Sequence, residues 1–379
     1  MKQMQPEVML KQIDDLGNLL RINFQEIDNN VKEAFSLDIL KRIQRVYTVG
    51  DGDSWHASMS VEMAFGEFAR LEYIPMCAMR FLEYGAEYIP MNFPSSNLVI
   101  GISASGSSTR VVQTMEKIQN INGEIVTACL VGNPDSKVAN ISRKVISAQI
   151  PSFGPSPGIR TYVASMLGLY ALAIRIGEAK SHYTHDYANA LRKEIVALSS
   201  FVDETAKSAV KPCKVAAKAL KEAPFISFVG SGPSFGTAYF SSAKVVEAAG
   251  IFSVAQDLEE WAHVEGLAYP LDFPVYMICP PGKGYWRAVK LARMITRFGH
   301  PLVVIGNSED DSMKEVSDFY FPVQGKMQEV FSPLVYHVAS NLFACYLAKE
   351  LGRLPFMMDN EEATKYSEFV TKQIKEQSR

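Results

Sequence analysis

The chain of 379 residues lacks long apolar runs and clusters of basic residues. No apolar stretch reaches the roughly 18–20 residues that a membrane-spanning helix needs, and the segment from Met1 to Pro6 lacks the apolar core of a signal peptide. The formal net charge is -3. We therefore expect neither nucleic acid nor an anionic membrane as a main partner.

Cysteine and histidine are also scarce. The five cysteines form no Cys-x-x-Cys pair, and the six histidines show no metal-ligand spacing. The cysteine pattern predicts no disulfide framework and favours a reducing, cytoplasmic compartment. We expect no metal and no cofactor.

What the chain does have is a run of hydroxyls and small residues over 101–109, with the sequence GISASGSST. It follows the apolar stretch 97–100 and precedes residues 110–118, whose apolar positions recur at helical spacing. A buried strand thus leads into a loop that opens a helix, where free backbone N–H groups and the helix dipole favour an anion. Phosphate binding is the functional interpretation; a serine-rich helix cap is the structural alternative.

The two halves of the chain follow one plan. The strand-like segment 45–49 leads into Gly50-Asp51-Gly52-Asp53-Ser54, and the segment 224–229 leads into Gly230-Ser231-Gly232-Pro233-Ser234. Downstream, 98–102 pairs with 275–279, and 129–133 with 303–307. These landmarks recur at nearly one offset, which indicates an internal repeat.

Alternating apolar strands and amphipathic helices predict an α/β fold with two doubly wound parallel sheets in tandem. Helical extensions flank them at both ends. We expect an N-terminal helical extension over residues 1–40. A first domain over 41–200 would carry the phosphate-binding loop, and a second over 201–379 would end in a C-terminal tail.

The two halves differ at the second loop. The hydroxyl-rich run has Cys279-Pro280-Pro281-Gly282-Lys283-Gly284-Tyr285 as its counterpart. Prolines remove N–H donors and the hydroxyls are gone. The first half is therefore expected to keep an anion site that the second half has lost.

These features resemble the sugar-isomerase (SIS) family, in particular the isomerase domain of glucosamine-6-phosphate synthase and its relatives, which include fructosamine-6-phosphate deglycases. The resemblance covers residues 40–365 and rests on the tandem halves, the Gly-rich first loop and the Ser-x-Ser-Gly-x-Ser second loop. It implies tandem SIS domains and a phosphorylated sugar as ligand. The implied phosphate-binding residues are Ser54, Ser103, Ala104, Ser105 and Ser108, with Gly52 and Asp53 beside the substrate.

The second half resembles the catalytic part of the same family. Glu247 and His263 are sixteen residues apart, the spacing of the family's catalytic glutamate and histidine, and Lys244 matches a lysine three residues before that glutamate. The resemblance implies that Glu247 moves a proton between C1 and C2 of the sugar, while His263 opens the ring or protonates the leaving group. In the family this histidine reaches the neighbouring subunit's site, which implies a homodimer with shared sites. Lys365 is the candidate for a sugar-contacting lysine of the tail.

The chain also departs from the family. Phe240 stands where the synthase has a second glutamate, seven residues before the catalytic one, and Glu259 replaces the glycine of its Gly-Glu-x-x-His segment. The 379 residues do not include the synthase's N-terminal glutaminase segment with its early cysteine nucleophile, and their first cysteine is Cys77. We therefore expect chemistry that does not use glutamine.

From the residues alone, each candidate also has a structural interpretation. Glu247, Lys244 and Lys365 could be solvated surface charges, and His263 a structural histidine. The apolar neighbours of Glu247 favour a buried helix end, where a carboxylate gains basicity.

Two other motifs fit poorly. The run 230–236 has its third glycine one place too late for a dinucleotide fingerprint, and the run 101–105 lacks the second glycine of a nucleophile elbow. The sequence thus predicts an isomerase, an amino-sugar deaminase or a deglycase acting on a phosphorylated sugar. A non-catalytic sugar-phosphate sensor is the alternative.

Overall fold

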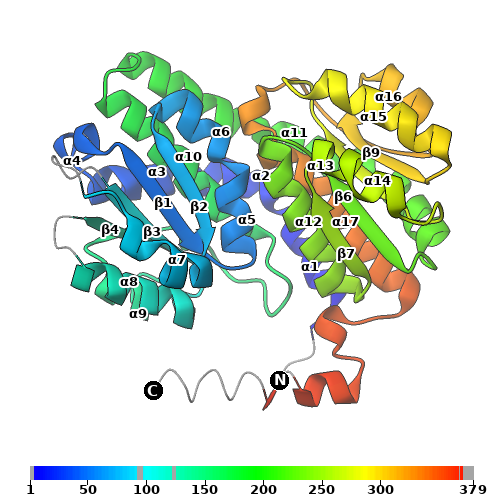
Figure 1. The fold of residues 1–379 in the computed structure, drawn as a ribbon, viewed down its shortest axis with the longest axis horizontal. Helices are drawn as coiled ribbons and strands as arrows, with labels where there is room; N and C mark the ends of the chain where they lie inside the picture. Colours follow the sequence, from blue (N-terminus) through cyan, green and yellow to red (C-terminus); the bar gives the residue numbers. More distant parts are fainter. Residues whose placement is uncertain (1–3, 92–96, 122–124, 367, 370–379) are drawn as a thin grey trace. The chain divides into compact units, whose positions relative to one another are not determined.

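The computed structural model describes residues 4–91, 97–121, 125–366, 368 and 369 (Figure 1). They form two compact units. The N-terminal unit comprises Asn18–Pro151 and Arg160–Ser199, and the C-terminal unit comprises Met1–Gly17, Ser152–Ile159 and Ser200–Arg379. The long helix α11 passes from one unit into the other at Ser199 and Ser200.

Helices and strands alternate along the first half of the chain. The elements are α1 (Pro6–Asp14), α2 (Leu16–Asn18), η1 (Leu19–Asn23), α3 (Phe24–Ala34), α4 (Leu37–Arg42), β1 (Arg45–Gly50), α5 (Asp53–Ser60), α6 (Glu62–Ala64), η2 (Phe65–Ala69), β2 (Glu72–Cys77), α7 (Ala78–Tyr84), η3 (Ala86–Tyr88), β3 (Asn97–Ser103), α8 (Thr109–Ile121), β4 (Val126–Val131), α9 (Lys137–Ile141), β5 (Lys144–Ser147), α10 (Arg160–Ala179) and α11 (His185–Leu220).

The second half repeats the alternation. Its elements are β6 (Phe225–Val229), α12 (Pro233–Ala249), β7 (Phe252–Gln256), α13 (Leu258–His263), α14 (Glu265–Ala268), β8 (Val275–Cys279), α15 (Tyr285–Phe298), β9 (Leu302–Asn307), α16 (Asp311–Val316), β10 (Phe319–Val323), η4 (Glu329–Phe331), α17 (Pro333–Leu351) and η5 (Pro355–Met357).

Each unit contains one five-stranded parallel sheet. The strand orders are β2-β1-β3-β4-β5 and β10-β9-β8-β6-β7. Counted from the first strand of each half, both sheets have the doubly wound order 2-1-3-4-5. This confirms the predicted fold class, and the paired segments of the two halves occupy equivalent strands.

The backbone confirms the repeat in detail. Gly52 has φ 53° and ψ −128°, and Gly232, which is 180 positions later, has φ 58° and ψ −131°. Glycine adopts such positive φ angles at little cost, whereas other residues are strained there. Both halves therefore turn from their first strand into the next helix through the same conformation.

The strands are apolar because helices cover both faces of each sheet. Every residue of β3 and of β8 is buried. In α8 the buried positions are Val111, Thr114, Met115 and Ile118, a single stripe at helical spacing. A Cβ at Gly101 would lie 2.9 Å from the Val111 side chain, so this glycine lets α8 pack closely against β3.

The N-terminal helices are divided between the two units. Helix α1 packs against α17, and Lys349 forms an ion pair of 2.8 Å with Glu7 there. Helices α3 and α4 instead pack against α10 of the N-terminal unit. The described part of the expected extension, residues 4–40, is thus mostly helical, and its helices pack in both units.

A buried ionic cluster joins three helices of the N-terminal unit. Arg192 of α11 donates to Asp28 of α3 and to Glu178 of α10, at 2.9 and 3.0 Å. Glu178 also accepts hydrogen bonds from Arg175 and His185. Burial disfavours the charge of Glu178, but these donors outweigh it and lower the pKa of Glu178 to about 2.

Candidate functional site

The carboxyl edge of the N-terminal sheet carries the expected anion-binding loops. Strands β2 and β3 lie on opposite sides of β1, so the topology reverses between β1 and β3. Ligands of open α/β sheets bind outside the strand ends at this switch point. Both the 50–54 loop and the hydroxyl loop, residues 103–109, lie there.

The hydroxyl loop turns tightly at the end of β3. Ser103 is the last residue of the strand and is buried, while Ala104 and Ser105 are exposed. Gly106 has φ 64° and donates its N–H to the Ser103 carbonyl at 3.0 Å. The Ser105 hydroxyl contacts that of Ser107 at 2.9 Å. These exposed hydroxyls lie on the solvent side of the loop.

The loop opens directly into helix α8. The Ser108 carbonyl accepts the Val112 N–H at 2.9 Å, so Ser108 stands where the helix begins. The first N–H groups of an α-helix have no partner within the helix. Together with the serine hydroxyls, they provide donors for an oxyanion without any metal.

The residues that follow β4, the strand next to β3, hold the hydroxyl loop in place. The Gly132 N–H donates to the Ala104 carbonyl at 3.1 Å, and a Cβ at Gly132 would lie 2.6 Å from that oxygen. A Cβ at Gly106 would overlap the Ser136 hydroxyl. Gly132 falls within the repeated segment 129–133, but no motif in the sequence indicates that Gly132 and Ser136 support the hydroxyl loop.

The first loop adjoins the hydroxyl loop. A Cβ at Gly50 would lie 2.8 Å from the Ser54 Cβ and 3.1 Å from the Ile102 carbonyl. The structure therefore brings Ser54, in the first turn of α5, next to the end of β3. Asp53 is 3.8 Å from His56, and Gly52 supplies the positive φ angle that starts the helix.

In the C-terminal unit, the loop that follows β8 is in contact with another part of the same chain. The Lys283 N–H donates to a Glu329 carboxylate oxygen at 2.8 Å. A Cβ at Gly282 would overlap that carboxylate. The remaining cavity beside Ser234 and Gly284 is only about 20 Å³. Glu329 thus takes up a backbone N–H of this loop and leaves little space beside it.

Lys244 and Glu247 form an ion pair on α12. The Lys244 side chain is fully buried and its Nζ contacts a Glu247 carboxylate oxygen, while the Glu247 side chain is 25% exposed. Lys244 Nζ also lies 5.0 Å from the centre of the Phe240 ring. A buried ammonium group needs such partners. Lys244 is therefore placed to hold Glu247 in position, and Glu247 alone of the pair reaches solvent.

The C-terminal segment begins beside this helix end. Arg353 donates to the Ala249 carbonyl at 2.6 Å, and a Cβ at Gly250 would lie 3.3 Å from the Met357 side chain. Lys365 lies further along the segment. Its side chain is 70% exposed and pairs with Glu361 at 2.6 Å. The structure leaves Lys365 on the surface.

His263 is at the C-terminal end of α13. Its side chain is 70% exposed and lies 3.3 Å from a Glu259 oxygen. Arg287 donates two hydrogen bonds to Glu259, one of 2.9 Å, and these lower the pKa of the Glu259 carboxyl. Glu259 therefore stays ionised beside the imidazole.

The structure does not bring Glu247 and His263 together within one copy of the chain. Helix α12 starts at the carboxyl end of β6 and ends before the amino end of β7, and Glu247 is in its last turn. His263 comes after the carboxyl end of β7. The two residues therefore lie at opposite edges of the sheet.

No helix among the residues that the structure describes combines the length and apolarity needed to cross a bilayer. Within the same part of the chain, no group of three or more His, Cys, Asp or Glu side chains is placed to hold a metal ion.

The fold and the loops define a class of protein: duplicated, doubly wound α/β proteins with a hydroxyl-rich loop at one switch point. Comparison with known proteins narrows this class. No family model matches the chain. The glutamine–fructose-6-phosphate aminotransferase (isomerizing) of Thermococcus kodakarensis is 25% identical over 358 residues, which are 92% of this chain and 56% of that protein. The chain spans about half the length of the curated relatives it matches.

Solved structures share the fold. The C-terminal domain of glucosamine-fructose-6-phosphate aminotransferase from Francisella tularensis superposes with a TM-score of 0.76 at 14% identity, covering 91% of this chain and 96% of that one. Glucosamine-6-phosphate deaminase from Thermotoga maritima gives a TM-score of 0.68 at 18% identity, covering 91% and 95%. The chain has the tandem sugar-isomerase fold, and the predicted resemblance to the isomerase domain of glucosamine-6-phosphate synthase is confirmed.

Proposed function

We propose that this chain binds a phosphorylated ketose, amino sugar or fructosamine and transfers a proton between its C1 and C2. The net reaction is an aldose–ketose isomerisation, an amino-sugar deamination or the cleavage of a sugar–amine adduct. The observation that carries the proposal is the hydroxyl loop, which presents serines and a helix N-terminus at the switch point of the sheet next to Ser54.

The phosphate is assigned to the N-terminal unit. Ser54, Ser103, Ser105 and Ser108 supply hydroxyl donors, and Ala104 supplies backbone at the centre of the loop. Gly52 and Asp53 border the sugar. Hydrogen bonds to a charged group contribute about 1.5–3 kcal/mol each, so a few of them give a phosphate-specific site.

The proton transfer is assigned to Glu247. The buried Lys244 fixes the carboxylate, whose exposed part can reach a substrate. His263 acts on the ring oxygen or the leaving group, and Lys365 contacts the sugar. Phe240 is fully buried beneath Lys244 and has no group to titrate. The absence of a carboxylate there supports chemistry that differs from the glutamine-dependent synthase.

The test is hydrogen exchange at the sugar carbons. The protein is incubated in deuterated water with fructose 6-phosphate, glucosamine 6-phosphate and fructosamine 6-phosphates, and NMR follows deuterium at C1 and C2. We expect exchange with at least one of them, and a loss of about 10²–10⁴-fold in Glu247→Gln. The control is Glu315→Gln, which removes an exposed carboxylate from α16.

The outcomes separate an enzyme from a sensor. Tight binding that depends on the serines, without exchange for any compound, would make the chain a sugar-phosphate sensor. Equal exchange rates in Glu247→Gln and the parent would remove Glu247 from the mechanism. A homodimer remains a prediction here, as does a cytoplasmic location.

A further inference from the structure

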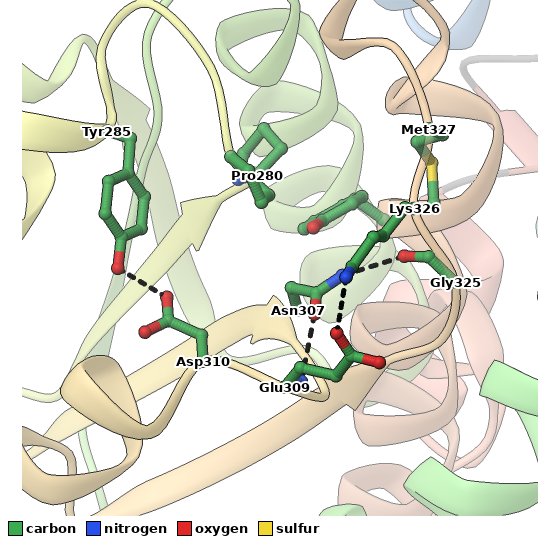
Figure 2. Close-up of a pocket in the computed structure, with 10 residues that line it drawn as sticks. Pro280, Tyr285, Asn307, Glu309, Asp310, Gly325, Lys326 and Met327 are labelled. Atoms are coloured by element: carbon green, nitrogen blue, oxygen red, sulfur yellow. Dashed lines mark hydrogen bonds and ion pairs between the residues drawn. The ribbon is translucent and has the colours of Figure 1, made fainter.

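A second cavity lies at the carboxyl edge of the C-terminal sheet, outside the site described above. Its volume is about 450 Å³, within the range of small-molecule pockets. Figure 2 shows how the ends of three neighbouring strands supply its walls. The residues used below are Pro280, Tyr285, Asn307, Asp310, Lys326 and Tyr336.

The N-terminal unit has a smaller cavity at the equivalent place. It is about 100 Å³ and is lined by Ala104, Gly132, Ala148 and Thr161, which follow β3, β4 and β5 or begin α10. The larger cavity is lined in a similar way by Pro280, which follows β8, Asn307, which ends β9, Gly325 after β10, and Tyr336 in the first turn of α17. The duplication has therefore produced two pockets of different size and chemistry.

The larger cavity does not suit an anion. Pro280 and Pro281 have no N–H to donate. Lys326, the only Lys or Arg among its described lining residues, is neutralised by Glu309 at 2.9 Å (Figure 2). The amide of Asn307 donates to the Gly325 carbonyl at 2.7 Å.

The remaining charge is the carboxylate of Asp310. The Tyr285 hydroxyl donates to its Oδ2 at 2.8 Å, and its Oδ1 accepts the Met313 N–H at the start of α16. Burial raises the pKa of Tyr285, and the hydrogen bond and charge of Asp310 raise it further. Burial also raises the pKa of Tyr336, and Coulombic interactions with Cys279 and Asp310 raise this pKa further. Asp310 thus gives the cavity a carboxylate that is not paired with a Lys or Arg among the described lining residues.

Tyr336 provides a second, independent observation. Its side chain is 1% exposed, and its hydroxyl has no hydrogen-bond partner within the described part of the chain. A buried hydroxyl without a partner is destabilising, so it needs an explanation. Because Tyr336 lines the cavity, a molecule bound there can supply the missing partner.

We propose that this cavity binds the primary ammonium group of a small organic molecule. Asp310 is the counter-ion, and the Tyr336 hydroxyl accepts an N–H. This site is separate from the hydroxyl loop and from Glu247, so it goes beyond the proposed sugar chemistry.

The test uses three probes of one length: n-butylamine, 1-butanol and butyrate. At pH 7 they carry a positive, no and a negative charge, and titration calorimetry measures their binding to the full chain. We expect the amine to bind at least about tenfold more tightly than the alcohol. Butyrate is expected not to bind.

Two variants locate the binding. Asp310→Asn removes the charge but keeps a side chain that caps helices as well as Asp does, and should weaken amine binding about 10- to 100-fold. Tyr336→Phe removes a hydroxyl that has no partner in the free protein. It should weaken amine binding about tenfold and leave the melting temperature unchanged or higher.

Matched controls are available in the same unit. Asp311→Asn removes an exposed charge next to Asp310, and Tyr276→Phe removes another buried hydroxyl without a partner that does not line the cavity. Both should bind the amine as the parent does. Equal binding of amine and alcohol, or unchanged amine affinity in Tyr336→Phe, would overturn the proposal. So would weaker amine binding in Ser103→Ala/Ser105→Ala, because the amine would then occupy the hydroxyl loop.

Discussion

If Glu247 and His263 act on one substrate, they have to come from two copies of the chain. Glu247 is near the amino edge of the C-terminal sheet and His263 is beyond its carboxyl edge. The five residues of β7 between them span about 16 Å. A general acid and a general base each need to lie within about 3 Å of the atom they serve. A phosphorylated sugar cannot meet both conditions within one copy.

Mixing inactive variants tests this arrangement. Glu247→Gln and His263→Ala should each lose about 10²–10⁴-fold in rate. After subunit exchange, half of the dimers are mixed, and each mixed dimer has one intact site of two. The mixture should therefore regain about a quarter of the parental activity. Native mass spectrometry of tagged chains measures the exchange itself.

The reciprocal mixture is the control. The parent mixed with the double variant Glu247→Gln/His263→Ala should give mixed dimers without any intact site, and about a quarter of the parental activity. If both residues instead served one copy's site, this mixture would keep about half. No recovery in the first mixture, with exchange demonstrated, would refute the shared site.

Further predictions concern the loops, the pH dependence and the nitrogen source. Ser103→Ala/Ser105→Ala should weaken phosphosugar binding by roughly two to three orders of magnitude in calorimetry, with an unchanged circular dichroism spectrum; parental affinity would exclude these serines. Gly132→Ala should also weaken it, because the new methyl group displaces the Ala104 carbonyl; unchanged binding would show that the loop adapts. Because the pKa of Glu178 is lowered to about 2, its contribution of about 1–3 kcal/mol should be complete above about pH 4.5 and be lost as the pH falls towards 2. Urea unfolding of Glu178→Gln should lack this dependence; the same slope in both proteins would contradict it. Amide-labelled glutamine should give no labelled sugar, and labelled product would refute independence from glutamine.

The sequence was sufficient to predict the repeat, the two doubly wound parallel sheets and the position of the hydroxyl loop after a strand. These features depend on local patterns: apolar strands, helical spacing and glycines that start a turn. Even the separation of Glu247 from His263 could have been deduced, since the strand-forming residues 252–256 stand between them.

Other features depend on contacts between remote parts of the chain, which local patterns do not encode. Glu329 meets Lys283 from 46 positions away, and α1 packs on α17 from the other end of the sequence. From the sequence alone, Lys244 could be a surface lysine. In the structure it is buried, because the packing of α12 decides which face of the helix is covered. The hydroxyl loop was predicted, but its support from Gly132 and Ser136 was not.

The contact of Glu329 with the Lys283 N–H has a consequence for anion binding by the second half of the chain. The Glu329 carboxylate is a ligand tied to its own binding site, so it loses no translational freedom on binding and does not diffuse away. An anion in solution must compete with this very high local concentration. Titration with inorganic phosphate should therefore saturate at one ion per chain rather than two. A ligand shifts the populations of a protein's conformations only when the fraction of protein that binds it changes. Glu329 is always present at its site, so it cannot act as such a signal. If the proposed phosphorylated ligand binds, any response of the protein to it has to start in the other half.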